Sequence, residues 1–303
     1  MGQSQSRQQQ LSRLRTPDGR ERTAIIVAPS TPPPTHGRAL VLMLHGTGGS
    51  AFNVMSSTRW AQLAVQDNFV AVFPNGTACD ETRPENFLRN PQTWNSEQGF
   101  SISSGGRSAE AKGVDDVAYL AALVSHVSST TAINPRRVFV AGHSNGACMA
   151  FHFAASRPDL IACVGAVAGH LRPGLACLPC PVSLICVSGD QDPFAPLVGG
   201  VVGVRGRDAT IVTRPQRLNA AEWARANGIP DAATTLRDDM HIFDLRWGPT
   251  EHGAEVRWVV IKGHGHSWPG GISRLSSMLV GPTSNALNGT IEIWSFIKAH
   301  PKP

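Results

Sequence analysis

Ser144 is the residue whose setting points most clearly to chemistry. It lies in the pentapeptide GHSNG at 142–146, directly after the apolar run VFVA and directly before residues that can form a helix. A serine on a tight turn between a buried strand and a helix has its hydroxyl pushed out of the sheet edge, where a substrate can reach it. The pattern G-x-S-x-G alone is weak evidence, but its strand and helix context makes Ser144 the leading candidate for a nucleophile.

A serine hydroxyl is too weak a nucleophile to act unaided, and two histidines are candidates for its base. His264 and His266 lie in the segment GHGHSWPGG at 263–271, which follows an apolar run typical of a strand. The glycines around them free this loop to bring an imidazole over the sheet edge. Position alone leaves the choice between the two histidines open. Metal binding by the pair is not expected, because no third ligand lies nearby.

The base in turn needs a carboxylate that holds its tautomer and stabilises the imidazolium. The apolar segment 182–188 runs into GDQDP, which contains Asp190 and Asp192. Asp190 follows the strand so closely that it is better placed to satisfy the turn, so we predict Asp192 as the partner of the histidine. The chain order serine, aspartate, histidine is the order expected of an α/β-hydrolase triad.

Two backbone N–H groups are predicted to stabilise the oxyanion of such a reaction. One belongs to Asn145, at the start of the helix after the serine, and the other to Thr47 in the loop HGTGGS at 45–50. This loop also fits a dinucleotide fingerprint, which requires an acid at the end of the next strand. That strand ends VFPNG at 72–76, without an acid, so a dinucleotide is not expected and no cofactor is predicted.

Apolar runs alternate with stretches of helical period from about residue 22 onward. This alternation predicts an α/β fold with a mostly parallel central sheet and helices on both faces, and in such sheets ligands bind at the carboxyl ends of the strands. The long irregular stretches 75–112 and 197–211 are candidate binding loops. The predicted strands are 23–27, 39–44, 69–73, 137–141, 163–168, 182–188, 240–247 and 256–262, and the predicted helices are 58–66, 114–128, 145–155, 215–227 and 290–298.

Composition favours one domain. The chain has 303 residues, of which 41% are apolar, and no linker divides its central stretch, so a single domain is predicted over 21–303. The first twenty residues are rich in Gln, Arg and Ser, which predicts a flexible tail over 1–20.

The net charge is +5, but the sequence contains no run of five or six basic residues, so nucleic acid is not an expected partner. No apolar run marks a secretory signal or a membrane span, and the oligomeric state stays open.

The cysteines are too sparse for a disulfide scaffold. Cys148, Cys163 and Cys186 lie in apolar segments and are predicted to be buried free thiols. Cys177 and Cys180 form a C-x-x-C pair that precedes a strand and has no second pair to complete a zinc site. For these two residues, a loop disulfide and two inert thiols are the alternatives.

Together the motifs resemble those of the polyhydroxybutyrate depolymerase and feruloyl esterase group, the LpqC-like esterases among the α/β-hydrolases. The resemblance covers about residues 18–297 and rests on DGRER, LHG, FPNG, WN, GVDDV, GHSNG and GHSWPG. In that family the histidine of the G-H-x-W-P-G segment is the triad base, which implies His266 over His264. The aspartate of the family's G-x-x-D turn corresponds to Asp192.

The resemblance implies a serine carboxylic ester hydrolase that acts on short-chain, hydroxyalkanoate (polyester) or hydroxycinnamoyl (feruloyl) esters through an acyl-enzyme. It also implies a secreted or periplasmic protein, with a cytoplasmic one as the alternative because no signal peptide is visible. Family members often carry a cysteine at the position of Thr47, and a C-C-G element where this chain has SEQGFS at 96–101. The family's substrate preference therefore does not carry over directly.

Three further residues are predicted to contact substrate. Trp268 and Trp94 are expected to provide apolar walls for an acyl or aryl group, and His45 is expected to contact substrate at the start of its loop. Packing beneath the loop is an equal alternative for Trp94. Asp115 and Asp116 are expected to interact with the dipole of the helix that they begin rather than to act in catalysis.

Two other functions compete with the esterase interpretation. A serine peptidase of the prolyl-oligopeptidase type shares the fold and the triad, but it usually carries a large additional domain. A non-catalytic α/β-hydrolase that binds a ligand would usually lack a triad residue, and here each has a candidate. Both therefore remain alternatives of lower rank than ester hydrolysis.

Overall fold

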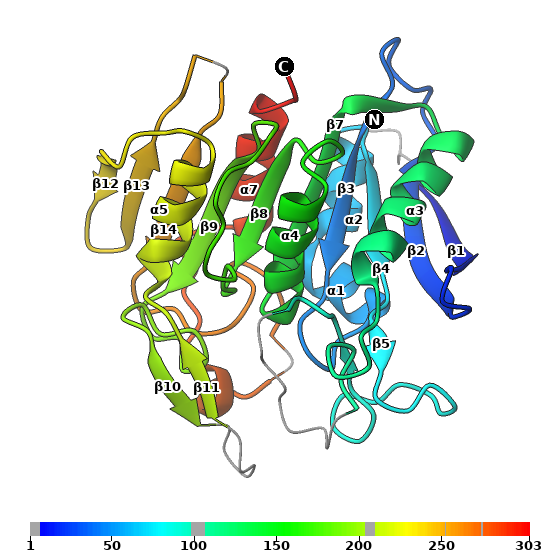
Figure 1. The fold of residues 1–303 in the computed structure, drawn as a ribbon, viewed down its shortest axis with the longest axis horizontal. Helices are drawn as coiled ribbons and strands as arrows, with labels where there is room; N and C mark the ends of the chain where they lie inside the picture. The colour runs from blue at the N-terminus through cyan, green and yellow to red at the C-terminus, as the bar shows by residue number, and fades with distance from the viewer. Residues whose placement is uncertain (1–6, 98–106, 204–209, 252, 274) are drawn as a thin grey trace, which may run out of the picture.

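The computed structural model describes residues 7–97, 107–203, 210–251, 253–273 and 275–303. Its main strands are β1 (Arg7–Arg15), β2 (Glu21–Pro29), β3 (Arg38–Leu44), β4 (Val70–Pro74), β7 (Ile133–His143), β8 (Cys163–Val167), β9 (Ser183–Gly189), β12 (Thr234–Asp238), β13 (Ile242–Trp247) and β14 (Val256–Ile261). They form one sheet in the order β1-β2-β4-β3-β7-β8-β9-β14-β13-β12 (Figure 1). Neighbours from β4 to β14 run parallel, and the strands at both edges pair antiparallel. The predicted mostly parallel sheet is confirmed.

Helices cover both faces of this sheet, as predicted. They are α1 (Ala51–Thr58), α2 (Trp60–Gln66), α3 (Asp116–Thr130), α4 (Asn145–Ser156), α5 (Gln216–Ala226), α6 (Ser277–Val280) and α7 (Gly289–Ala299). The layer of α3, α4 and α5 covers one face, and α1, α2 and α7 cover the other (Figure 1). Side chains of β3 alternate between the two layers, with Leu40 and Leu42 in one core and Val41 and Met43 in the other. Burial on both faces explains why the central strands are apolar at nearly every position.

Strand β1 corrects the expectation of a flexible tail over residues 1–20. Its backbone pairs antiparallel with β2 from Arg7 to Arg15, while residues 1–6 lie outside the described part. The polar composition is compatible with this edge position because one face of β1 is solvated. Ser12 is buried and Leu14 packs against the core, whereas Leu11 and Arg13 are exposed. Backbone pairing with an existing sheet edge orders this segment, which the composition argument did not consider.

The predicted helix 58–66 is present as α2, which begins two residues later, but the preceding helix α1 was not predicted. Arg59 adopts a left-handed backbone conformation with φ 63° and separates α1 from α2. Residues of α1 were not predicted to be helical, because AFNVMSST is rich in Ser, Thr and Asn, which compete with the helix for hydrogen bonds. Ser50 caps α1 by accepting a hydrogen bond from the N–H of Asn53. The other predicted strands and helices are present with boundaries shifted by a few residues.

Both long irregular stretches contain short strands. β5 (Thr77–Ala78) pairs with β6 (Gln92–Thr93), and β10 (Gly200–Gly203) pairs with β11 (Thr210–Thr213), each antiparallel. These hairpins, β12 and α6 were not predicted. No helix among the described residues is long and apolar enough to span a membrane.

The described cysteines all carry free thiols. Cys148, Cys163 and Cys186 are buried, as predicted. Cys177 is exposed and Cys180 is half-buried, and no disulfide joins them. The structure therefore corresponds to the inert-thiol alternative for this pair.

Candidate active site

Ser144 lies on a strained turn between β7 and α4. Its backbone has φ 56° and ψ −125°, a conformation that costs a non-glycine residue about 1–3 kcal/mol. Glycine is required at positions 142 and 146 because a Cβ at either position would collide with nearby backbone atoms. A Cβ on Gly142 would lie 2.2 Å from the carbonyl oxygen of Gly146, and a Cβ on Gly146 would lie 2.4 Å from that of His45. The sharp turn points the Ser144 hydroxyl out of the sheet edge, as the motif predicts.

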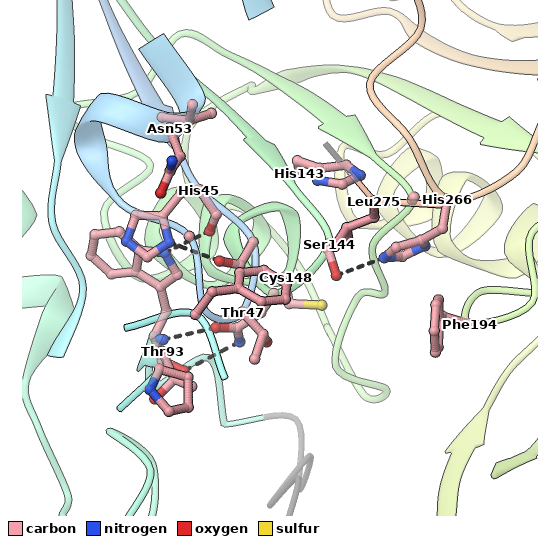
Figure 2. Close-up of a pocket in the computed structure, with 18 of the residues that line it drawn as sticks. His45, Thr47, Asn53, Thr93, His143, Ser144, Cys148, Phe194, His266 and Leu275 are labelled. Atoms are coloured by element: carbon pink, nitrogen blue, oxygen red, sulfur yellow. Dashed lines mark hydrogen bonds between the residues drawn. The ribbon is translucent and has the colours of Figure 1, made fainter. Parts of the chain in front are cut away.

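The structure brings Ser144, His266 and Asp192 together. Figure 2 shows the imidazole of His266 beside the hydroxyl of Ser144. His266 Nε2 lies 2.8 Å from Ser144 Oγ, and His266 Nδ1 lies 2.7 Å from Asp192 Oδ2. The side chain of Asp192 is fully buried, and that of His266 is 11% exposed. A hydrogen on Nδ1 that is donated to the carboxylate leaves Nε2 to accept the proton of the serine hydroxyl. This is the geometry of a nucleophile, a base and an orienting acid.

Asp192 is held as an ionised carboxylate. Its Oδ1 accepts hydrogen bonds from the N–H groups of Phe194 and Ala195, each at 2.8 Å. Burial alone would raise the pKa of Asp192, but the adjacent His266 and these two N–H groups together lower it below its usual range. The carboxylate therefore stays charged and can stabilise an imidazolium next to it.

Asp190 and His264, the rejected alternatives, hold the loop that carries His266. Asp190 Oδ1 accepts the N–H of Gly263 at 2.7 Å. His264 is 2% exposed, and its Nδ1 accepts the N–H of Ser284 at 3.0 Å. Its Nε2 is therefore the protonated nitrogen and donates to the carbonyl of Ser267 at 3.0 Å. Neither residue is hydrogen-bonded to Ser144, so their observed contacts are structural.

Thr47 and Asn145, whose amides are predicted to form the oxyanion hole, line the same cavity as Ser144. Thr47 lies on the loop after β3, and Asn145 is the first residue of α4. The first N–H groups of a helix have no acceptor within it. Among the described residues, neither amide donates a hydrogen bond to another part of the chain. Both N–H groups are thus available for an anion.

His45 lines the cavity, but its expected contact with substrate is corrected in one respect, because both ring nitrogens are already hydrogen-bonded within the protein. It is 1% exposed, its Nε2 accepts the N–H of Gly76 at 2.9 Å, and its Nδ1 donates to the carbonyl of Gly46 at 2.8 Å. Burial lowers the pKa of His45 to about 4, so the ring is neutral near pH 7. His45 therefore joins the loop after β3 to the loop after β4 instead of contacting substrate through its ring nitrogens.

The two tryptophans differ in position. Trp94 borders the cavity, but it is 1% exposed and its Nε1–H donates to the carbonyl of His45 at 2.9 Å, so the indole lies packed beneath the loop that begins at His45. The prediction that Trp268 forms a cavity wall is wrong. Its Nε1–H donates to Thr290 Oγ1 at 2.9 Å, which turns the indole into the core beneath α7 and away from the residues that line the cavity.

A cavity of about 430 Å³ opens beside Ser144. Its rim carries Leu88 and Leu279, which are 73% and 43% exposed, and Phe194 lies with its ring edge-on to His266 at 5.1 Å (Figure 2). The predicted binding loop 75–112 contributes to the lining, whereas none of the described residues of 197–211 does. Sequence reasoning missed Phe194 and Leu279 because they belong to no motif. The lining also includes Phe87, Leu275, Val280, Asn53, Ser57, Ser108, Glu110, Cys148 and His170.

Among the described residues, no group of three or more His, Cys, Asp or Glu side chains is arranged to hold a metal ion.

Two buried histidines predict how stability depends on pH. Burial lowers the pKa of both His45 and His170 to about 4, whereas histidine in an unfolded chain titrates near pH 6.5. Between these values the unfolded chain binds more protons, so their contribution to stability is complete above about pH 6.5 and declines as the pH falls. We expect the free energy of unfolding to decrease by up to about 3 kcal/mol per pH unit from these two residues.

Urea unfolding between pH 7 and 5 measures this slope. His170→Gln should make the slope shallower, since it removes one of the histidines whose pKa burial lowers, a group that also includes His143. His36→Gln is the matched control, because His36 is exposed. An identical slope in His170→Gln and the parent would contradict the assignment.

The matching family model is that of the phospholipase/carboxylesterase family, and it covers residues 23–201, more than half of the chain. The chain belongs to this family. Ester hydrolysis by an α/β-hydrolase of the carboxylesterase type is therefore supported by family membership as well as by the geometry of the site.

Curated relatives carry esterase names. NocK of Nocardia uniformis subsp. tsuyamanensis, which bears an esterase name, is 26% identical over 281 residues, 86% of this chain and 74% of NocK. Feruloyl esterase B of Piromyces equi is 25% identical over 236 residues, 75% of this chain and 39% of that protein. The bifunctional acetylxylan esterase/xylanase XynS20E of Neocallimastix patriciarum is 22% identical over 251 residues, and the match spans 31% of it. The chain thus spans about a third of the two fungal relatives.

Solved structures show the same fold. An acetyl xylan esterase from Aspergillus awamori superimposes with a TM-score of 0.55 and 16% identity, covering 86% of this chain and 94% of the other. The native structure of pOPH gives a TM-score of 0.60 and 14% identity, covering 97% of this chain and 88% of the other. The predicted α/β-hydrolase fold is confirmed.

Proposed function

We propose that this protein is a serine esterase that hydrolyses short-chain, hydroxyalkanoate or hydroxycinnamoyl esters through an acyl-enzyme. The observation that carries the proposal is the line of hydrogen bonds from Ser144 Oγ through His266 to the buried carboxylate of Asp192, beside an open cavity. Family membership supports the general reaction, and the choice of substrate rests on the resemblance and on the shape of the cavity.

In the first half-reaction, Ser144 Oγ attacks the ester carbonyl carbon while its proton passes to His266 Nε2. The electron pair of the carbonyl π bond moves onto oxygen, and the resulting oxyanion accepts hydrogen bonds from the amides of Thr47 and Asn145. Collapse of this intermediate breaks the bond to the alcohol oxygen, which takes the proton from His266. An acyl-enzyme on Ser144 and a free alcohol remain.

In the second half-reaction, water replaces the alcohol. His266 accepts a proton from water as the water oxygen attacks the acyl carbon, and the same two amides hold the second oxyanion. Collapse returns the proton to Ser144 Oγ and releases the carboxylic acid. Asp192 stays ionised throughout and stabilises the imidazolium in both halves.

The cavity supports small or aryl acyl groups. Its volume of about 430 Å³ lies in the lower part of the range of about 300–1,000 Å³ typical of ligand sites. Phe194 lies next to His266, and Phe87 lines the cavity from the loop 75–112, so both present aromatic surface. The names of the feruloyl and acetylxylan esterase relatives are compatible with such substrates. A long acyl chain would extend past the rim, and its outer methylenes would stay unburied.

The chain-length profile of kcat/KM for p-nitrophenyl esters tests this substrate class. We expect acetyl to butyryl esters to react with higher kcat/KM than the dodecanoyl ester, because each unburied methylene forgoes about 0.8 kcal/mol of binding free energy. Methyl ferulate and a polyhydroxybutyrate suspension, assayed beside them, distinguish the hydroxycinnamoyl and polyester alternatives. A profile that still rises beyond about eight carbons would reject the small acyl site.

A further inference from the structure

We infer that Trp94 and the side chain of Asn145 form a brace that positions both amides of the oxyanion hole. This inference rests on the proposed function and adds two positioning residues to it. In the brace, the Asn145 side chain holds the backbone of Trp94, and the Trp94 indole holds the loop that carries Thr47. The two amides lie on separate elements, α4 and the loop after β3, so their mutual distance depends on a connection between them.

The first arm of the brace is the Asn145 side chain. Its Oδ1 accepts the N–H of Trp94 at 2.7 Å, and its Nδ2 donates to the carbonyl of Trp94 at 3.3 Å and to Ser96 Oγ at 3.4 Å. The side chain thus pairs with one peptide segment in both directions. It leaves the Asn145 N–H, at the start of α4, as the group directed to the oxyanion. The side chain itself is occupied by protein partners.

The second arm is the Trp94 segment. The indole Nε1–H donates to the carbonyl of His45 at 2.9 Å, and the carbonyl of Gln92 accepts the N–H of Gly48 at 2.8 Å. Thr47 lies between these two attachment points in the sequence. The segment 92–94 therefore fixes the loop on both sides of the Thr47 amide. His45 and Thr47 lie on one side of Ser144, opposite His266 (Figure 2).

A buried ion pair anchors the brace at its other end. Asp116 Oδ2 accepts the N–H of Asn95 at 2.8 Å, and Asp116 Oδ1 lies 2.7 Å from Arg22 Nη2. The side chains of Asp116 and Arg22 are 0% and 4% exposed. Asp116 therefore serves in an ion pair and a loop contact, beyond the expected interaction with the helix dipole. Asp115 caps α3 by accepting the N–H of Ala118. Shielding from water strengthens these hydrogen bonds and keeps the segment rigid.

The chain offers a matched control for Asn145. Asn227 Oδ1 accepts the N–H of Val182 at 2.9 Å, and Asn227 Nδ2 donates to the carbonyl of Val182 at 3.1 Å. This is the same two-way pairing of an asparagine with one backbone residue. It lies just before the amino end of β9, whereas Ser144 follows the carboxyl end of β7.

Asn145→Ala removes the first arm, and Trp94→Phe removes the indole hydrogen bond of the second. Deleting an oxyanion donor outright lowers kcat by about 10²–10³-fold, so displacing one should lower kcat by about 10–100-fold with KM for p-nitrophenyl acetate nearly unchanged. The Ki of a trifluoromethyl ketone, whose adduct with Ser144 carries the oxyanion, should rise by the same factor as kcat/KM falls. Asn227→Ala should lower the melting temperature but leave kcat and this Ki nearly unchanged.

Deuterium uptake of a peptide covering 44–49 provides a readout without turnover. It should increase in Asn145→Ala and Trp94→Phe and stay unchanged in Asn227→Ala. An inactive parent enzyme would refute the proposed function, while the uptake would still decide whether the brace holds the loop. A rise in KM at constant kcat, an equal kcat loss in Asn227→Ala, or unchanged uptake in both brace variants would overturn the inference. If Asn145→Ala fails to fold, Trp94→Phe, which keeps an aromatic ring in place, decides it.

Discussion

Ser144→Ala should give a folded protein whose kcat/KM for p-nitrophenyl acetate is at least about 10⁴-fold below that of the parent. The reason is covalent chemistry: without Oγ no acyl-enzyme forms, and only binding and oxyanion stabilisation remain. The substitution removes one hydrogen bond to His266 and keeps the Cβ, so the strained turn at φ 56° is unchanged. Stability should therefore change little.

Circular dichroism and urea unfolding establish that the variant is folded before its activity is compared. Ser125→Ala is a suitable control, because the Ser125 hydroxyl donates a hydrogen bond to the carbonyl of Ala121 on an exposed turn of α3. It should retain the parent's activity. If Ser144→Ala kept activity within about tenfold of the parent, Ser144 would not be the nucleophile.

The convergence of Ser144, Asp192 and His266 could be predicted from sequence because each of them follows a parallel strand. Ser144 follows β7, Asp192 follows β9 and His266 follows β14. In a parallel sheet these strand ends meet at one edge, so local patterns of strand and turn residues were enough to bring distant residues together. The glycines of GHSNG gave a second local signal, since their positions are set by backbone approach within the turn.

Side-chain direction could not be predicted in the same way. Trp268 follows His266 by two residues, yet its partner Thr290 lies 22 residues further along the chain and turns the indole into the core. His45 is likewise occupied by Gly76, 31 residues away. A motif fixes where the backbone runs, whereas the orientation of a large side chain depends on partners that packing supplies. The same reason explains why Phe194 and Leu279 were missed at the cavity.

The prediction of a flexible tail was wrong over residues 7–15 for a related reason. Composition measures how much apolar surface a segment can bury, but β1 is ordered largely by backbone hydrogen bonds to β2. Whether a sheet edge is available to pair with residues 7–15 is a property of the whole topology. It is not visible in the polar sequence RQQQLSRLR itself.

His266→Ala should lower kcat/KM about as far as Ser144→Ala does, whereas His264→Ala should retain most of kcat. His266 Nε2 is within 2.8 Å of the hydroxyl whose proton must move, and residues that act as one unit show nearly equal losses when either is removed. The variant lacking both Ser144 Oγ and the His266 imidazole should consequently be no slower than either single variant. If the activity losses of the two single variants multiplied in the double variant, Ser144 and His266 would not act as one unit.

His264→Ala provides the contrast, because it removes a buried imidazole from the same loop. It loses hydrogen bonds to Ser284 and Ser267, so we expect the free energy of unfolding to fall by about 1–3 kcal/mol. Activity should survive, since Gly265 N–H to the carbonyl of Pro282 and His266 N–H to that of Val280 still fix the backbone beside the base. Steady-state kinetics at a temperature where both variants are folded separates the two histidines. Loss of activity in His264→Ala, with activity retained in His266→Ala, would show that the base is His264 and that the bonded pair of His266 and Ser144 is structural.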